Sequence, residues 1–328
     1  MADPEKIGKY EVVERIGAGG CGVVYRARDP YIQREVAIKV CISHDDQQRK
    51  RFFREAQVIG SLNHPAIISI FDFGFENSNP FLVEELLSGE DLGTLIRTKR
   101  PISMSSKLDY LVQVAEALLF AHHAGVLHRD IKPSNVQVLE DGQVKLMDFG
   151  VARLLEDEES RLTRQGVLVG TMGYMAPEQI RGLKPDRRAD IFSFGALAYE
   201  LLTYERPFPV EDLTRMIRAV LQDQPTPITE RFPECPPALA HLVNKCLEKE
   251  CARRYEGFEE VLAEFRTLRG ETLDSVAIAP PDEAPAAEEP SPNGPAAAKT
   301  VVLEEGAPTP ERADKASSAQ LPLGASAD

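Results

Sequence analysis

The first part of the chain alternates short apolar runs with turn-forming residues, a pattern typical of β-strands. The runs are rich in Val and Ile, and we expect strands over Tyr10–Ile16, Gly22–Arg28, Glu35–Cys41, Ile67–Phe73 and Pro80–Glu84. Between the third and the fourth of these, Phe52, Ala56 and Ile59 recur at spacings of four and three. They would share one face of a helix over roughly Asp46–Leu62.

After about residue 100 the apolar positions follow the helical period instead. One apolar stripe, from Leu108 to Leu119, predicts a helix over about Ser103–Ala124. Further helices are expected near Arg188–Thr203, Glu211–Gln222, Pro237–Glu248 and Phe258–Leu268. A small sheet-rich half followed by a larger helical half indicates an α+β chain, and no internal repeat is visible.

The last part of the chain, residues 271–328, has a different composition. It contains no aromatic residue, nine prolines, many alanines, and eleven acidic residues against three basic ones. Such a segment cannot bury enough apolar surface to offset the entropy lost on ordering. We therefore expect a disordered tail rich in Ala, Pro and Glu.

Composition and charge narrow the class of protein. With 43% hydrophobic and 27% charged residues, the chain of 328 residues can build a sizeable core. Its net charge of −14 argues against nucleic acid as a partner, because nucleic-acid-binding proteins normally carry a basic face. No secretion signal or membrane span is expected. Five scattered cysteines without a CxxC pair favour the reducing cytoplasm as its location.

Residues 17–24 form a glycine-rich segment, with the pattern GxGxxGxV, between the first two expected strands. Glycine lets the backbone adopt positive φ and approach a ligand, so that its amides can cover phosphate oxygens. A dinucleotide-binding fold is disfavoured, because there the third glycine opens a helix, whereas a Val-rich strand follows here. Alone, the motif fits a hairpin without a ligand equally well.

A lysine in an apolar strand is the next candidate. Lys39 follows Val36-Ala37-Ile38, and a lysine is seldom buried without a partner. Glu55, in the expected helix, would be that partner, and the pair would orient the ammonium group toward phosphates. Each residue taken alone would fit an ordinary surface charge.

The segment from His128 to Asn135 reads HRDIKPSN and is far more specific. Asp130 can accept or orient the proton of an attacking hydroxyl group. Lys132 can offset negative charge that builds on a transferred phosphoryl group, and Asn135 supplies a hard oxygen ligand suited to Mg²⁺. A polar loop explains the HRD triplet, but it does not explain the whole spacing.

Eighteen residues after Asp130 comes the triplet Asp148-Phe149-Gly150. Asp148 would hold a metal ion that bridges the β- and γ-phosphates, and Phe149 would pack beneath the helix that carries Glu55. A lone triplet of this kind would indicate only a turn. At this distance from the HRD segment, it completes a set of phosphate- and metal-binding residues.

Together these motifs resemble the eukaryotic-type (Hanks-type) serine/threonine protein kinase family over about residues 10–268. Several stretches of the sequence are similar to bacterial members of that family. The resemblance implies a bilobal fold. The N-lobe, about 10–86, would hold a small antiparallel sheet and one main helix, and the larger C-lobe, about 87–268, would be mainly helical. It also implies that Asp190 lies in a central helix and that Arg254 pairs with Glu178.

The resemblance further implies an activity, the transfer of the γ-phosphate of ATP to Ser or Thr hydroxyls of proteins. Mg²⁺ would be the metal, with Mn²⁺ as a substitute. The implied catalytic residues are Asp130, Lys132, Lys39 and Glu55, and the implied metal ligands are Asn135 and Asp148. The implied ATP contacts are Ile16, Gly17, Ala18, Gly19, Gly20, Cys21, Gly22, Val23, Val24, Ala37, Lys39, Glu85 and Leu87.

Lys132 together with Gly170-Thr171 resembles the serine/threonine branch rather than the tyrosine branch. Arg129, directly before the expected catalytic aspartate, suggests control by an activation segment. A phosphate on Thr163 could pair with its guanidinium group and order the loop. We expect Thr163 and Thr171 to be regulatory, and exposed hydroxyls without such a role are the alternative.

Two positions depart from the family pattern. Glu84 falls at the gatekeeper position, which is usually apolar, just before a hinge over 85–87 whose backbone would meet adenine. Gln137 falls where a Leu or Met normally supports the ring. An unpaired carboxylate there would be costly or would take up a proton. Glu84 would accept a hydrogen bond from Gln137, Lys39 or the adenine amino group, or it would point elsewhere.

Two other function classes fit the sequence less well. A pseudokinase scaffold has only Glu84 and Gln137 in its favour, because every catalytic polar residue is present. A small-molecule phosphotransferase would lack the segment 170–178, which resembles the part of the activation segment that receives a peptide. Proteins with Ser or Thr acceptors are therefore the expected partners, and the oligomeric state stays open.

Overall fold

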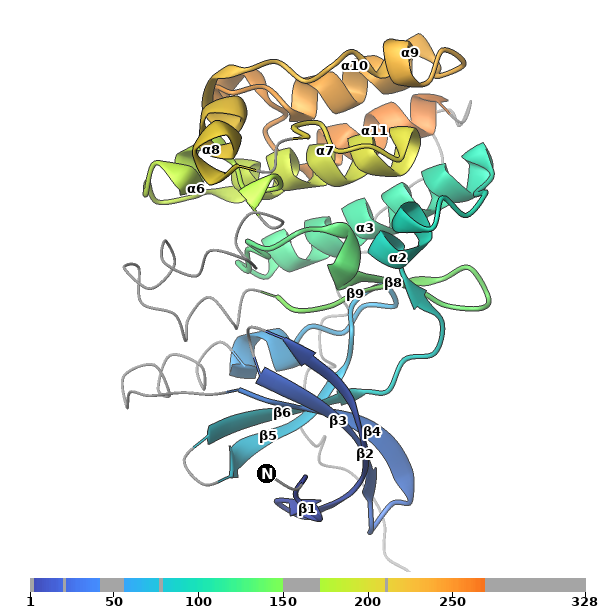
Figure 1. Cartoon of the computed structure of the whole chain (residues 1–328), viewed down its shortest axis with the longest axis vertical. Helices are drawn as coiled ribbons and strands as arrows, with labels where there is room; N and C mark the ends of the chain where they lie inside the picture. Colours follow the sequence, from blue (N-terminus) through green and yellow to red (C-terminus); the bar gives the residue numbers. More distant parts are fainter. Residues whose placement is uncertain are drawn as a thin grey trace, which may run out of the picture. The chain divides into compact units, whose positions relative to one another are not determined.

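A six-stranded antiparallel sheet forms the N-terminal half of the chain (Figure 1). The computed structural model describes residues 3–19, 22–41, 56–76, 79–149, 172–209 and 212–268, all within one compact unit. The sheet has the order β1-β2-β3-β4-β6-β5. Its strands are β1 Lys6–Ile7, β2 Tyr10–Gly19, β3 Gly22–Asp29, β4 Arg34–Val40, β5 Ile70–Glu76 and β6 Asn79–Glu85.

The two faces of this sheet have different surroundings. One face carries a small apolar core made of Ile7, Tyr10, Tyr25, Ala27, Val36, Ile38, Phe81 and Val83. Side chains alternate between the faces along a strand, so the residues between these core positions must point the other way. On β4 and β6 those residues include Ala37, Lys39, Leu82 and Glu84, which places them on the face opposite the small core.

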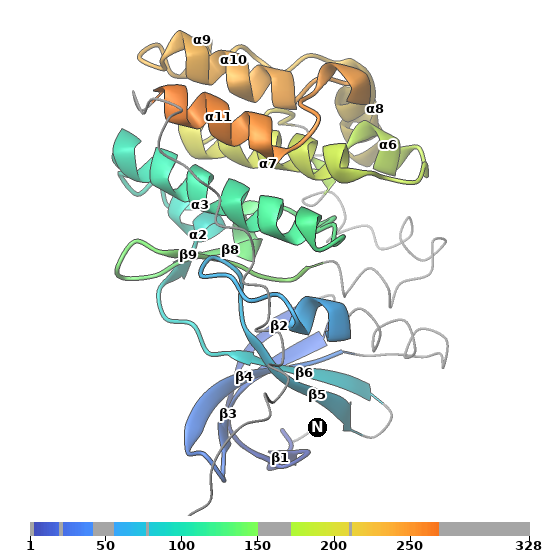
Figure 2. The same ribbon diagram turned by 180° about the vertical axis from the view of Figure 1, so that it is seen from behind.

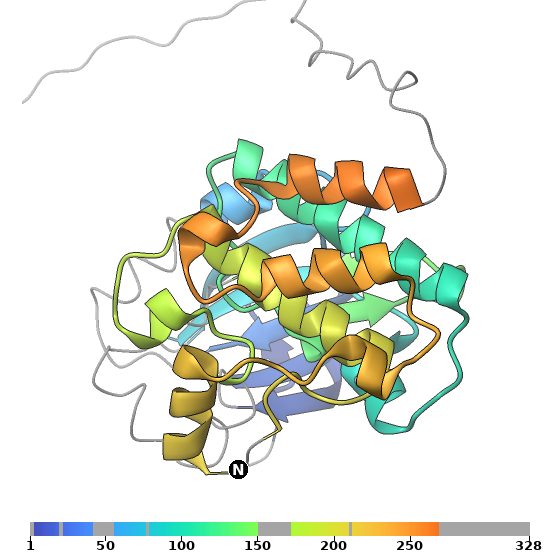
Figure 3. The same cartoon turned by 90° about the horizontal axis from the view of Figure 1, so that it is seen from above.

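Helices make up the C-terminal half, and Figures 2 and 3 show them from behind and from above. Their bounds are α2 Leu92–Arg97, α3 Met104–His123, α6 Pro177–Ile180, α7 Arg187–Thr203, α8 Leu213–Gln222, α9 Ile228–Arg231, α10 Pro237–Cys246 and α11 Phe258–Leu268. Helix α7 is buried over nearly its whole length, because α3 and α10 both pack against it. None of the helices in the described ranges is long and apolar enough to cross a bilayer.

A second, three-stranded sheet lies on the side of the helical half that faces the N-terminal sheet (Figure 1). It consists of β7 Glu90–Asp91, β8 Val136–Val138 and β9 Val144–Leu146. A bridge from Ile67 to Leu146 links β9 to the segment before β5. Both candidate loops are attached to this small sheet, because Asn135 directly precedes β8 and Asp148 closely follows β9.

The expected α+β fold with two lobes is confirmed. All five expected strands occur as β2–β6, with ends within three residues of the expectation. The expected helices of the second half occur as α3, α7, α8, α10 and α11. Residues 56–60 are helical, but the rest of the helix expected over 46–62 lies outside the described residues, as does the tail from 271 to 328.

Candidate functional site

The glycine-rich segment forms the β2–β3 hairpin, in which Gly19 pairs with Gly22. Gly22 has φ +136°, and a Cβ there would lie 1.9 Å from the Val40 carbonyl oxygen, so only glycine fits. At Gly17 a Cβ would meet Val24 at an ordinary 3.7 Å, so packing within the protein does not require a glycine. A residue without a side chain lets the backbone approach a ligand closely. Gly20 and Cys21 lie outside the described residues.

Lys39 lies on β4, between Val24 of β3 and Leu82 of β6. Its side chain is 13% exposed, and its Nζ forms an ion pair of 2.5 Å with Oδ1 of Asp148. This contact joins the N-terminal sheet to the loop that follows β9. The expected partner Glu55 lies outside the described residues, whereas the ion pair with Asp148 was not anticipated from the sequence.

Asp148 has a left-handed backbone conformation, with φ +57°. Desolvation raises the pKa of its carboxyl group, but the charge and hydrogen bond of Lys39 outweigh this effect and hold the pKa below its ordinary value. Phe149 is buried, and its ring lies 4.5 Å from that of His128, centroid to centroid. Phe149 also lines a pocket together with Ile59 of the helical residues 56–60, which agrees with the expected packing beneath that helix.

The segment HRDIKPSN brings its polar side chains together. Lys132 Nζ lies 2.7 Å from Oδ2 of Asp130. Asn135 Nδ2 donates to the backbone oxygen of Asp130 at 2.8 Å and to its Oδ2 at 3.1 Å. Because its amide nitrogen is engaged in this way, Asn135 presents its Oδ1 oxygen elsewhere. The loop therefore offers a carboxylate, an ammonium group and an amide oxygen within one short turn.

Asp190, in the first turn of α7, holds this loop in place. Its two carboxylate oxygens accept hydrogen bonds of 2.8 Å from the backbone N–H groups of His128 and Arg129. A third contact, also 2.8 Å, joins it to His122 Nε2 at the end of α3. Arg129 has φ +65°, so two hydrogen bonds to a buried carboxylate stabilise an otherwise unfavourable backbone. Burial raises the pKa of Asp190, but the hydrogen bond and electrostatic interaction with His122 outweigh this effect and hold the pKa below its ordinary value.

The comparisons with known proteins agree with this geometry. The family model described as the protein kinase domain matches residues 10–265. A probable serine/threonine-protein kinase of Corynebacterium efficiens is 36% identical over 289 residues, which cover 84% of this chain and 44% of that protein. The serine/threonine-protein kinases PknB of Mycolicibacterium smegmatis and Mycobacterium tuberculosis are 35% and 34% identical, over 84% and 80% of this chain and 45% and 43% of those proteins.

This chain belongs to the protein kinase family. It is similar to bacterial members of the Hanks type, as the sequence motifs indicated. The chain spans less than half the length of these curated relatives. What the relatives do outside the shared region therefore does not transfer to it.

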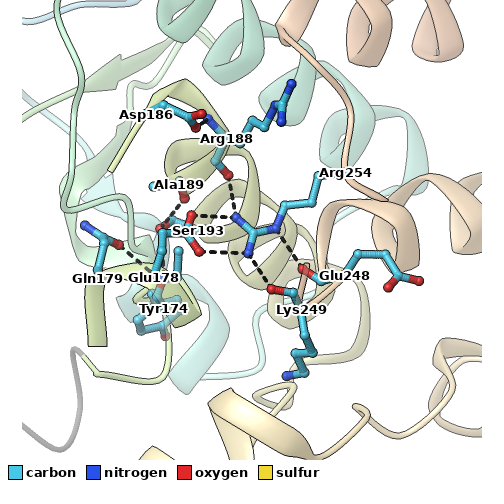
Figure 4. A network of polar contacts seen from close by, with 11 residues as sticks. Tyr174, Glu178, Gln179, Asp186, Arg188, Ala189, Ser193, Glu248, Lys249 and Arg254 are labelled. Carbon is cyan, nitrogen blue, oxygen red and sulfur yellow. Dashed lines mark hydrogen bonds and ion pairs between the residues drawn. The ribbon is translucent and has the colours of Figure 1, made fainter. Parts of the chain in front are cut away.

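A buried ion pair supports the C-lobe of the kinase domain (Figure 4). Arg254 donates to both carboxylate oxygens of Glu178, at 2.7 and 2.9 Å, as the resemblance implied. Its guanidinium group also donates to the backbone oxygens of Arg188, Glu248 and Lys249. Burial raises the pKa of Glu178, but the hydrogen bond and charge of Arg254 lower it below its ordinary value.

The positions expected to be the gatekeeper and the start of the hinge carry two carboxylates with different surroundings. Glu85 accepts a 3.0 Å hydrogen bond from Lys145 on β9, a contact that sequence reasoning missed. Glu84 pairs across strands with Ala37 and lines the pocket that also contains Lys39 and Asp148. Desolvation raises the pKa of Glu84 to about 7, the charge of Asp148 adds to the rise, and Lys39 opposes it.

Several expected site residues cannot be placed. Gly20, Cys21, Glu55, Thr163 and Thr171 lie outside the described residues. Ile16, Gly17, Ala18, Gly19, Gly22, Val23 and Val24 lie on the β2–β3 hairpin, Ala37 lies on β4, and Leu87 follows β6. Missed contacts such as Lys145–Glu85 and Lys39–Asp148 join residues 60 and 109 positions apart, so no local sequence signal could have revealed them.

Proposed function

We propose that this chain is a serine/threonine protein kinase that transfers the γ-phosphate of ATP to Ser or Thr hydroxyls of proteins. Its relatives carry that activity in their names. One structural observation carries the proposal. Lys39 from the N-terminal sheet converges with Asp148, while Asp130 and Asn135 lie on the adjoining loop before the same small sheet.

In this proposal Asp130 orients the acceptor hydroxyl and takes its proton. Its Oδ2 is held by Lys132 and Asn135, which fixes the carboxylate relative to the loop. Lys132 contacts the same oxygen, so its ammonium group would lie near the acceptor hydroxyl. From there it would neutralise negative charge on the phosphoryl group in transfer. Positioning and charge stabilisation of this kind account for most of the catalysis in phosphoryl transfer.

The side chains of Asn135 and Asp148 suit Mg²⁺, which prefers oxygen ligands and is usually held by one or two carboxylates together with substrate phosphates. Asn135 keeps an amide oxygen for this role because its nitrogen is bonded to Asp130. Asp148 keeps its second carboxylate oxygen because Lys39 contacts Oδ1. When bound, the metal would neutralise charge on the β- and γ-phosphates. Mn²⁺ would serve as a substitute.

Regulation through the activation segment is part of the proposal. The Nε of Arg129 is buried and has no hydrogen-bond partner in the part of the chain that the structure describes. A phosphate on Thr163, or a contact of Thr171 with the catalytic loop, would supply negative or polar groups next to it. We also propose residues 10–268 as the kinase domain, with lobes meeting near residue 86, a separate tail from 271, and a cytoplasmic location.

Incorporation of phosphate from γ-labelled ATP into a mixture of Ser- and Thr-containing proteins tests this function. Wild-type protein should label substrates in the presence of Mg²⁺, and removal of Mg²⁺ with EDTA should abolish labelling. Asp130→Asn should lower the rate at least about a thousandfold, because the proton acceptor is lost. Asp141→Asn is the matched control, since Asp141 is exposed in the turn between β8 and β9 and should leave the rate unchanged.

The alternative of a pseudokinase scaffold makes the opposite prediction. Wild-type protein would then label substrates no faster than the Asp130→Asn variant, before or after preincubation with ATP. That outcome would overturn the proposed activity while leaving membership of the family intact.

A further inference from the structure

Glu84 lines the same pocket as Lys39 and Asp148. Among the described residues of β4 and β6 that line this pocket, it is the one acidic side chain. It lies between Ala37 on one side and Ile70 on the other. Its neighbour Val83 points into the small core on the opposite face. The register therefore rules out the arrangement in which the Glu84 carboxyl group points away from the pocket.

The partners that the sequence left open within the protein do not bind Glu84. In the described residues no hydrogen bond or ion pair joins it to Gln137 or to Lys39, and the ammonium group of Lys39 contacts Asp148 instead. Most of the remaining pocket wall is apolar: Cys41, Ile59, Ile68, Ile70, Leu82 and Phe149. Among the described residues, no hydrogen bond or ion pair compensates the half-buried carboxyl group of Glu84, which is costly, and a ligand that donates a hydrogen bond would offset that cost.

The position of Glu84 along the sheet indicates which part of a nucleotide it would meet. The pair Ala37–Glu84 lies two residues from the pair Lys39–Leu82, and strands rise about 3.3 Å per residue, so the pairs are about 7 Å apart. Lys39 marks the phosphate end, because it contacts Asp148. Glu84 lies toward the hinge, next to the backbone of Glu85 and thus at the end where the base would bind.

We propose that Glu84 determines base specificity by accepting a hydrogen bond from the 6-amino group of the purine. This inference rests on the proposed function, because it assumes that ATP binds between the two lobes. A carboxylate has only acceptor oxygens, whereas a protonated carboxyl group also carries one O–H donor. A 6-oxo purine would present an acceptor to an acceptor, so ionised Glu84 selects amino purines over oxo purines.

The test measures binding of three diphosphates with Mg²⁺ by titration calorimetry at pH 8.5: ADP, inosine diphosphate, and purine riboside diphosphate, which lacks any group at position 6. No phosphate transfer is needed for this readout. In the Glu84→Met variant the preference for ADP over purine riboside diphosphate should shrink about tenfold, which corresponds to about 1.4 kcal/mol for one hydrogen bond to a charged acceptor.

A second variant separates acceptance from packing. Glu84→Gln keeps an acceptor oxygen and adds an N–H donor. It should retain most of the preference for ADP over purine riboside diphosphate, yet bind inosine diphosphate about tenfold better relative to ADP than wild type does. Glu234→Met is the control, because Glu234 is exposed and should leave all three affinities unchanged.

The possible failures are distinguishable. If wild-type protein binds none of the three diphosphates, the proposed function fails and the inference falls with it. If wild-type protein binds ADP but Glu84→Met and Glu84→Gln show the wild-type ratios among the three ligands, the inference alone is overturned. If Glu84→Met does not fold, the ratio of inosine diphosphate to ADP in Glu84→Gln decides by itself.

Discussion

Arg254 and Glu178 show how strongly a single buried charge can matter in this molecule. The Arg254 side chain is 0% exposed and that of Glu178 is 8% exposed. Removing one partner would leave the other charge buried without compensation, which typically costs about 3–5 kcal/mol. We therefore expect Arg254→Met to lower the free energy of unfolding by about 3–5 kcal/mol in urea titrations.

The neighbouring Arg253 provides the control for this experiment. Its side chain is 66% exposed and its ion pair with Glu250 lies at the surface. Exposed pairs contribute about 0–1 kcal/mol, so Arg253→Met should be nearly neutral. Similar losses in the two variants would contradict a special role for the buried pair.

Glu84 should make the stability of the nucleotide-free protein depend on pH. Its pKa in the folded protein is about 7, above the value of 4.5 expected when it is exposed. A raised carboxyl pKa means that the folded state binds more protons than the unfolded state between these values. The contribution is therefore complete below about pH 4.5 and is lost as pH rises through 7. At pH 8, Glu84→Gln should be more stable than wild type by about 1–3 kcal/mol, a range reduced for partial exposure.

Melting temperatures measured from pH 5 to pH 8.5 without nucleotide would check this expectation. The difference between Glu84→Gln and wild type should grow with pH, whereas Glu234→Gln, at an exposed position, should track wild type throughout. A constant difference across the range would mean that Glu84 does not titrate there.

At the scale of secondary-structure elements, α7 holds the HRDIKPSN loop in place through Asp190. An asparagine at this position would keep one acceptor oxygen but would turn an N–H₂ group toward a backbone N–H. We expect Asp190→Asn to lower kcat about a hundredfold with a smaller change in the KM for ATP, because misplacing reacting groups by about 1 Å costs about that much. Steady-state kinetics would measure both constants.

Asp186 lies one turn earlier and supplies a control at the same helix. It caps α7 by accepting a hydrogen bond from the backbone N–H of Arg188, far from the chemistry. Asp186→Asn keeps a capping side chain and should leave kcat unchanged. If both variants lose activity equally, the effect comes from destabilising α7 as a whole.

The longer elements could be predicted because their patterns are local. Helix α3 shows an apolar stripe and begins after Ser103, whose side chain caps it, and the strands β3 and β4 alternate around a small core. The shorter elements were missed for the opposite reason. Helix α2 has six residues and β7 has two, so their stability comes from packing and from the Asp91 cap rather than from a periodic pattern.

The sequence predicted which residues belong to the candidate site, but it did not predict which of them contact one another. The spacing within each motif indicates which residues belong together, and the structure brings Asp130, Lys132 and Asn135 into contact. The contact Lys39–Asp148 joins elements of different lobes, and the orientation of Glu84 depends on the register between β4 and β6. Register and interlobe contacts arise from tertiary packing, so single-sequence reasoning left them open.

At the scale of the whole molecule, the proposed nucleotide site takes residues from both halves, so a bound nucleotide should stabilise the folded chain. A nucleotide–metal complex present at a hundred times its Kd adds about 2.7 kcal/mol, which for a domain of this size raises the Tm by about 5–10 °C. We expect this rise with ADP and Mg²⁺ in thermal unfolding. It should largely disappear on addition of EDTA and in Asp148→Asn, which loses the carboxylate proposed to hold the metal.

Arg129 combines an unfavourable left-handed backbone with a buried Nε that lacks a hydrogen-bond partner among the described residues. Glycine adopts that backbone conformation freely and carries no side chain to satisfy. Under laboratory evolution that rewards heat resistance and ignores catalysis, Arg129→Gly should therefore become enriched. Such variants would keep the fold while losing the guanidinium group that we propose to bind an activating phosphate.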